Sequence, residues 1–195
     1  MSVVMSVKQG DRIWLGADTQ VTCGSDRFNQ LSQNDFKIAK MDNGVLIAMT
    51  GETVTSQALL AHPEWFTVDE KKGLTKEHIV TKIIPKIYET LEEEELLERG
   101  DRGTPPIMKI RMLLAYKDRL FEICRDLQVI RYEDYQATGS GANAVIYGLS
   151  RIDKNKDVNE QLLRLLRISA KQDTNVSAPF VFIDTKGLEF TVKEG

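Results

Sequence analysis

Residues 2–18 read SVVMSVKQGDRIWLGAD, and this stretch decides the fold. Apolar and polar side chains alternate over residues 2–8, which is the pattern of a strand with one buried face. Gln9, Gly10 and Asp11 favour a turn, and residues 12–18 then give the pattern of a second strand. The chain is therefore expected to begin with an antiparallel hairpin.

The same reasoning extends along the chain. Two more strands are expected at residues 36–41 and 45–50, joined by the turn Asp42-Asn43-Gly44, and a helix is expected at 52–61. Apolar residues recur at helical spacing between residues 79 and 91, which predicts a long amphipathic helix with a kink at Pro85. Three strands are then expected at 107–116, 120–124 and 128–132. One helix is expected to follow the bend at 138–141 and end near residue 150, and a second is expected at 158–171. Two strands, at 179–185 and 188–192, complete the expected elements.

This order of elements predicts the fold class. Strands, two helices, strands, two helices and strands suit an α+β fold, namely a four-layer αββα sandwich in which two antiparallel sheets are flanked by helix pairs. At 195 residues the chain is within the range of one domain, and no repeat or linker divides it. Residues 1–195 are therefore expected to form a single domain.

Composition narrows the classes of function. The sequence is 42% hydrophobic and 28% charged with a net charge of -3, so it has no basic field to hold nucleic acid or an anionic membrane. Its longest apolar runs, such as residues 45–49, are far shorter than the roughly 20 residues of a membrane span. No secretory leader is evident, and the two cysteines, Cys23 and Cys124, are expected to be reduced, buried thiols of a cytoplasmic protein.

Metal and imidazole chemistry are not indicated. The only histidines, His62 and His78, do not lie at a metal-ligand spacing. The acidic run at residues 92–95 is best explained as a solvated helix face, because adjacent carboxylates on a helix point in different directions. We therefore expect no metal and no cofactor.

Ser2 is the first candidate for chemistry. Methionine aminopeptidases remove Met1 when a small side chain follows, and its removal would place a free α-amine beside the Ser2 hydroxyl. An α-amine has a pKa of about 7.7 to 8.0 and can accept the hydroxyl proton near neutral pH. Nucleophiles activated in this way by an N-terminal amine are a recognised type, although many proteins begin with Met-Ser.

Asp18 and Lys37 are the next candidates. A buried lysine near Ser2 would lower the pKa of the amine and stabilise the alkoxide, and it would need a carboxylate such as that of Asp18 to stay charged. Spacing alone favours a simpler explanation, in which Asp18 ends a strand at a turn and Lys37 is a surface lysine. Both explanations remain open at this point.

Four segments, in this order, resemble proteasome β subunits and their bacterial relatives, the HslV-type peptidases. The first is residues 2–22, and the second comprises FKI at residues 36–38 with NGVLIAMTG at 43–51. The third is the bend ATGSG at 137–141, and the fourth is SAKQD at 169–173. The likeness is close near the beginning of the chain and over 136–150, loose over 165–187, and rests on element order alone between 55 and 135.

The resemblance implies the catalytic roles of the first candidates. Ser2 matches the nucleophile, Lys37 matches the catalytic lysine, and Asp18 matches the carboxylate partner of that lysine. The chain departs from the family by having serine where threonine is usual, and by a longer segment between Thr22 and Lys37.

The resemblance also implies three supporting residues. The family binds the oxyanion with a backbone N–H, often that of a glycine, and here the match falls near Ala48. Ser140 matches a serine that lies beside the nucleophile, and Asp173 matches a distal aspartate at the end of a helix.

Together these matches imply a self-compartmentalising peptidase. Such a homo-oligomeric ring would enclose its sites, admit unfolded polypeptide and be served by an ATP-dependent unfoldase. The alternative is a non-catalytic proteasome-like ring or shell subunit, and an amidase or acylase is more distant. Asp18 together with Lys37 favours the enzyme, because a shell subunit has no use for a costly buried ion pair, whereas retention of Met1 would favour the alternative.

Overall fold

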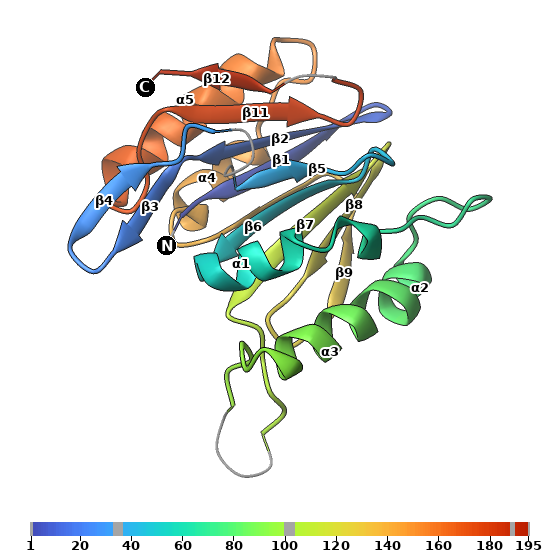
Figure 1. The fold of residues 1–195 in the computed structure, drawn as a ribbon. Coiled ribbons are helices and arrows are strands. Elements are labelled where there is room, and N and C mark those ends of the chain that lie inside the picture. The colour runs from blue at the N-terminus through green and yellow to red at the C-terminus, as the bar shows by residue number, and fades with distance from the viewer. Residues whose placement is uncertain (1, 33–36, 100–103, 188–189, 195) are drawn as a thin grey trace.

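Two five-stranded antiparallel sheets pack face to face in the computed structural model of the chain (Figure 1). The structure describes residues 2–32, 37–99, 104–187 and 190–194, so parts of the strands expected at 36–41 and 188–192 lie outside the described residues. The strand order of the first sheet is β10 (Tyr135–Thr138), β1 (Val4–Gln9), β2 (Arg12–Asp18), β11 (Phe180–Asp184) and β12 (Thr191–Lys193). The order of the second is β5 (Ile38–Lys40), β6 (Leu46–Gly51), β7 (Ile110–Tyr116), β8 (Arg119–Ile123) and β9 (Val129–Tyr132).

The hairpin predicted at the beginning of the chain is present. β1 pairs with β2 in a register that sets Val4 opposite Ala17 and Gln9 opposite Arg12. The turn between them is formed at Gly10, whose φ of 61° suits a glycine. This hairpin forms the middle of the first sheet, because β10 pairs with the free edge of β1 and β11 pairs with the free edge of β2.

Side-chain alternation divides the interior into three cores. The core between the two sheets includes Val4, Leu15 and Val181 from the first sheet and Ala48 and Leu113 from the second. The other face of the first sheet is covered by α4 (Ala142–Leu149) and α5 (Val158–Gln172). The other face of the second sheet is covered by α1 (Thr53–Leu60) and α3 (Ile84–Glu93). The predicted four-layer αββα sandwich is thereby confirmed (Figure 1).

The long helix expected around Pro85 changes its hydrogen-bonding pattern just before the proline. It consists of α2 (Lys76–His78), a π-helical segment (Ile79–Ile83) and α3. Within it the Ile84 N–H donates to the carbonyl of Ile79, and Pro85 follows with no N–H to donate. The apolar face stays buried against the second sheet on both sides of the interruption, through Ile79, Ile83, Ile87 and Leu91.

A hairpin after β2 was not expected from the sequence. β3 (Gln20–Cys23) and β4 (Asp26–Asn29) form a separate two-stranded sheet that extends from the end of β2 (Figure 1). All four residues of β4 are exposed, so the segment lacks the buried alternation by which a strand is recognised. The expectation that both cysteines are buried is wrong, because Cys23 on this hairpin is exposed and Cys124 is only partly buried, and both thiols are free.

The antiparallel pairing brings several chain segments to one end of the sandwich. The beginnings of β1 and β5 meet the ends of β2, β6 and β10 there, because each strand runs opposite to its neighbour. This end therefore collects the residues before β1 and β5 and those that follow β6 and β10. None of the helices formed by the described residues has the length and apolar character that a membrane crossing requires.

Candidate active site

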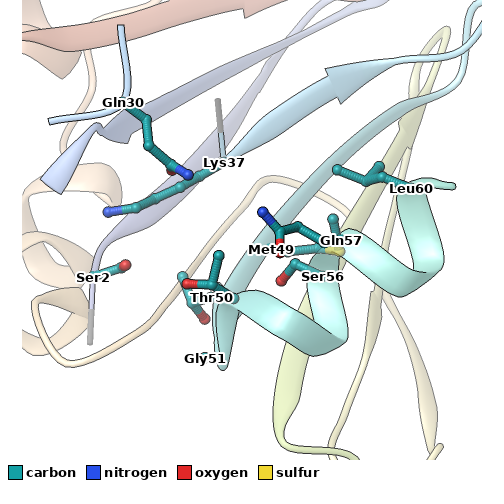
Figure 2. A pocket seen from close by; sticks show the side chains of 10 residues that line it. Ser2, Gln30, Lys37, Met49, Thr50, Gly51, Ser56, Gln57 and Leu60 are labelled. Carbon is teal, nitrogen blue, oxygen red and sulfur yellow. The ribbon is translucent and has the colours of Figure 1, made fainter. Parts of the chain in front are cut away.

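A pocket opens at this end of the sandwich and contains Ser2 (Figure 2). Ser2 and Lys37 lie on one side of it, and side chains of α1 lie on the other. The described residues that line the pocket are Ser2, Gln30, Lys37, Met49, Thr50, Gly51, Thr53, Ser56, Gln57 and Leu60. Two residues that the sequence singled out, Ser2 and Lys37, thus share one cavity, although Ser2 precedes β1 of the first sheet and Lys37 precedes β5 of the second.

Lys37 and Asp18 form a buried ion pair beside this pocket. The Lys37 Nζ lies 2.7 Å from the Asp18 Oδ2, and the lysine side chain is only 9% exposed. Asp18 also accepts two backbone hydrogen bonds, from the Val3 N–H at 2.9 Å and from the Gln20 N–H at 3.1 Å. The explanation of Lys37 as a surface lysine and of Asp18 as an ordinary turn residue is therefore excluded by their burial.

Burial shifts the pKa of both members of the pair. It lowers the pKa of Lys37, because desolvation disfavours the ammonium, and the charge of Asp18 opposes this shift. Burial likewise raises the pKa of Asp18, against the effect of Lys37 and of the two backbone donors. Beyond its ion pair, the Lys37 Nζ has no hydrogen-bond partner among the described residues, so it retains donor capacity beside Ser2.

The backbone of Ser2 is held by the bend that follows β10. The Ser2 N–H donates to the Ser140 Oγ at 3.2 Å, and the Ser2 carbonyl accepts a hydrogen bond from the Gly141 N–H at 3.1 Å. Gly139 has a φ of 102°, and a Cβ at this position would collide with the Ser2 carbonyl, so the bend requires glycine here. The bend therefore places the Ser140 hydroxyl against the nitrogen of Ser2.

Asp173 lies behind Ser140, at the end of α5. Its Oδ1 accepts hydrogen bonds from the backbone and side-chain N–H groups of Asn175, both at 2.9 Å, while its Oδ2 is buried without a partner among the described residues. Burial raises the pKa of Asp173, but the nearby Ser140 hydroxyl and the Asn175 donors outweigh it, so the net pKa lies below the ordinary value. The carboxylate therefore stays ionised at neutral pH.

Ala48 does not lie in the pocket. Its side chain is buried in the core between the sheets, and it pairs with Ile38 on one side and Leu113 on the other. The Met49 N–H donates to the Lys37 carbonyl at 2.8 Å. Because N–H groups alternate between the two sides of an antiparallel strand, the Ala48 N–H points toward β7, away from Lys37.

Gly51, three residues after Ala48, is the candidate that the geometry offers for the backbone donor that the resemblance placed near Ala48. Its N–H points to the same side as that of Met49 by the same alternation, and the residue lines the pocket. Its φ of 128° and the collision that a Cβ would make with the Lys109 carbonyl show that glycine is required. Gly51 is the only glycine close to Ala48 on its C-terminal side. The strand register is needed to choose between these two residues as the backbone donor.

Sequence reasoning also missed Gln30 and Thr50. Gln30 reaches the pocket because the β3–β4 hairpin returns the chain to Thr19, whose carbonyl accepts the Gln30 N–H at 2.9 Å. The Thr50 hydroxyl lies 3.3 Å from that of Thr138 and links the two sheets beside the site. Both positions depend on contacts between distant segments, so no local pattern marks them.

A metal centre is not apparent at this site. No group of three or more His, Cys, Asp or Glu side chains that could hold a metal ion occurs in residues 2–32, 37–99, 104–187 and 190–194. The groups gathered around Ser2 are instead a hydroxyl, an ammonium, carboxylates and backbone N–H donors. These are the components of nucleophilic acyl transfer.

Solved structures of three other proteins share the fold. BPH from Thiobacillus denitrificans is 20% identical, with a TM-score of 0.73 over 93% of this chain and 96% of BPH. HslV from Trypanosoma brucei is 18% identical, with a TM-score of 0.63 over 93% of this chain and 98% of HslV. Anbu, an ancestral beta-subunit from Yersinia bercovieri, is 11% identical, with a TM-score of 0.72 over 98% of this chain and 86% of Anbu.

The similarity is one of structure rather than of sequence. No protein-family model matches the sequence, and no curated protein matches it either. The chain shares the fold of these three structures, HslV among them, over nearly its whole length. At 11% to 20% identity the comparison establishes the fold, so the chemistry has to be argued from the residues of the site.

Proposed function

We propose that this chain, which has the fold of proteasome β subunits and HslV, hydrolyses peptide bonds with Ser2 as an N-terminal nucleophile. The observation that carries the proposal is the Lys37–Asp18 ion pair, buried beside the pocket that contains Ser2. A buried ammonium and carboxylate are costly to maintain and contribute little net stability, so their presence is best explained by chemistry. The proposal requires cleavage of the Met1–Ser2 bond, because only then does Ser2 carry an amine.

The proposed reaction begins with proton transfer within Ser2. The free α-amine accepts the proton of the Ser2 hydroxyl, and the Oγ attacks the scissile carbonyl carbon to form a tetrahedral oxyanion. The Gly51 N–H, directed toward the Lys37 side of β6, is the donor that we assign to this oxyanion. Collapse expels the leaving amine, which takes the proton from the α-ammonium, and water then hydrolyses the acyl ester.

The surrounding charges change the pKa of the Ser2 amine and the stability of negative charge on the Ser2 Oγ. The Lys37 ammonium lowers the pKa of the neighbouring amine and stabilises negative charge on the Oγ, while Asp18 keeps the lysine charged in its buried setting. Ser140 accepts a hydrogen bond from the Ser2 nitrogen and orients it, and Asp173 supports Ser140 from behind. Each of the residues proposed from the sequence, apart from Ala48, thus has a place in this scheme.

We further propose that the chain works as a closed homo-oligomeric ring. The proposal follows from the sequence resemblance, which implies a ring that encloses its sites. Unfolded polypeptide is the substrate class that such a ring would admit, with an ATP-dependent unfoldase as the partner and the cytoplasm as the compartment. Light scattering tests the ring: a stable 22.1 kDa monomer at micromolar concentration would contradict it.

Peptide hydrolysis by wild type, Ser2→Ala and Lys37→Ala tests the catalytic assignment. Each preparation is analysed by intact mass, which reports whether Met1 has been removed, and by light scattering for assembly. We expect Ser2→Ala to lose more than about a thousandfold in kcat/KM, as loss of a nucleophile does, while keeping the assembly of wild type. Equal activity in all three proteins would disprove the assignment, and an inactive wild type that retains Met1 would support the non-catalytic ring or shell subunit.

A further inference from the structure

A second pocket lies next to the first and differs from it in charge. Thr50 and Gly51 line both pockets, so the two meet at the residue that we assign to the oxyanion. The remaining lining of the second pocket comes from β7 and the residue before it, from Arg125 and from the bend after β10: Lys109, Ile110, Arg111, Arg125, Gly139 and Ser140. Three of these residues are cationic, and none of the described residues that line the pocket is acidic.

The carboxylates that balance these cations contact them from outside the lining. Lys109 pairs with Glu52 at 3.3 Å, Arg111 with the fully buried Glu122 at 2.6 Å, and Arg125 with Glu98. The three cationic side chains nevertheless remain 35% to 46% exposed. They can therefore approach a second anion from solvent while keeping their partners.

The proposed chemistry determines which part of a substrate lies against this pocket. The leaving amine takes its proton from the nitrogen of Ser2, and that nitrogen is hydrogen-bonded to Ser140, which lines the second pocket and not the first. The residues that follow the scissile bond must therefore leave the site on the Ser140 side. The residues that precede it extend toward the pocket that Lys37 and Met49 line.

We infer that the second pocket binds a carboxylate on the leaving-group side of the substrate, through Lys109, Arg111 and Arg125. The inference rests on the proposed function and adds a substrate preference to it. The carboxylate is supplied either by an acidic side chain shortly after the scissile bond or by the C-terminus of a short substrate. Both sources present the same anion to the same three cations.

The test uses a peptide that the wild type cleaves at one bond, located by mass spectrometry. It is resynthesised in three forms that are identical before that bond. The first has Asp as the second residue after the bond and an amidated C-terminus, the second has Asn there and is also amidated, and the third ends at that Asn with a free carboxylate. We expect kcat/KM for the first or the third form to exceed that for the second by about two- to fivefold at low salt, the range typical of an exposed charge pair, and the advantage to shrink at 0.5 M salt.

A double variant and a matched control test whether the second pocket causes the preference for the charged substrate. Lys109→Gln with Arg125→Gln removes two of the three cations and spares Arg111, whose loss would leave the buried Glu122 unpaired. The ratio of charged to neutral substrate should fall to about one in this variant and persist in Lys82→Gln with Arg164→Gln, which removes one exposed lysine and one exposed arginine elsewhere. If the double variant does not fold, Lys109→Gln alone is used, and the ratio should then fall by about half.

The outcomes separate this inference from the proposed function. Absence of any peptide cleavage by the wild type would disprove the proposed function itself. Cleavage of all three forms at equal rates would overturn the inference alone, as would a preference that survives in Lys109→Gln with Arg125→Gln. A preference lost equally in the control pair would also overturn it, because the whole-protein charge would then be responsible.

Discussion

The Lys37 ammonium lies 2.7 Å from the Asp18 carboxylate, and this contact joins the first sheet to the edge of the second at the end of the sandwich that holds Ser2. Asp18 ends β2 in the first sheet, and Lys37 directly precedes β5 in the second. Because both groups are buried, each depends on the other to remain charged. Removing either one therefore has consequences for stability as well as for hydrolysis.

Replacement of Lys37 by Met should affect both quantities. Hydrolysis should fall by at least about a hundredfold, because the amine of Ser2 loses its neighbouring ammonium. The free energy of unfolding should fall by about 3 to 5 kcal/mol, because Asp18 is left as an unpaired buried charge. Urea unfolding and peptide hydrolysis measure the two effects. The double variant Asp18→Asn with Lys37→Met should regain most of the stability and none of the activity, and an active double variant would contradict the assignment.

Replacement of Gly51 by Ala tests the oxyanion donor. The added Cβ would collide with the Lys109 carbonyl at a φ of 128°, so the strand end must shift and displace the N–H from the pocket. We expect kcat to fall by about a hundredfold or more, the cost of losing one oxyanion donor. Gly24→Ala is the matched control, since Gly24 also has a positive φ but has open space around its Cβ position. A Gly51→Ala enzyme as active as Gly24→Ala would assign the donor elsewhere.

Replacement of Asp173 by Asn should shift the pH dependence of hydrolysis. The pKa of Asp173 lies below its ordinary value, so the group is negatively charged wherever the amine of Ser2 titrates. A negative charge stabilises the ammonium and raises the pKa of the amine, and the free amine is the active form. The acid limb of the kcat/KM profile should therefore move to lower pH in Asp173→Asn, by less than about one unit because Ser140 separates the two groups. An unchanged limb or a shift to higher pH would contradict the proposed arrangement.

The buried carboxylate under the cationic pocket makes a prediction that does not depend on catalysis. Glu122 is fully buried and accepts a hydrogen bond from the Tyr132 hydroxyl at 3.0 Å. Burial, and then the charge of Glu122, raise the pKa of Tyr132 to about 12. In Glu122→Gln this pKa should fall toward the ordinary value of about 10, as measured by NMR of tyrosine labelled at Cζ. Tyr147, which is exposed, is the internal control, and an unchanged Tyr132 pKa would contradict this effect of Glu122 on Tyr132.

The sheets and helices were largely predictable because their side-chain patterns are local. β2 occurs with the expected bounds, and β1, β6, β8, α1 and α5 differ from expectation by two residues or fewer at each end. The strands among them are short apolar runs bounded by turn residues, and α5 carries apolar residues at helical spacing, so the sequence displays these elements directly. The β3–β4 hairpin was missed because β4 buries none of its residues, and β10 was missed because the burial of its four residues does not alternate along the strand.

The backbone donor proposed for the oxyanion could not be identified from the sequence alone. The segment that contains Ala48 and Gly51 was identified correctly as a strand end, but the choice between the two residues depends on which N–H groups are used by β7. That choice is made by register, and register is set by the pairing of β6 with strands before and after it in the chain. Gln30 entered the pocket by a similar route, through a hairpin that the sequence did not reveal.

The sequence by itself determined the αββα fold and the chemical types available to the site, because alternation, turn residues and the positions of Ser2, Asp18 and Lys37 are written in local order. Only the tertiary structure decided which of these groups meet. The contact of Lys37 with Asp18, the placement of Ser140 against the Ser2 nitrogen and the direction of the Gly51 N–H all join segments that are distant in the chain. Such contacts follow from strand register and sheet packing, which depend on the whole core being formed, and no short stretch of sequence encodes them.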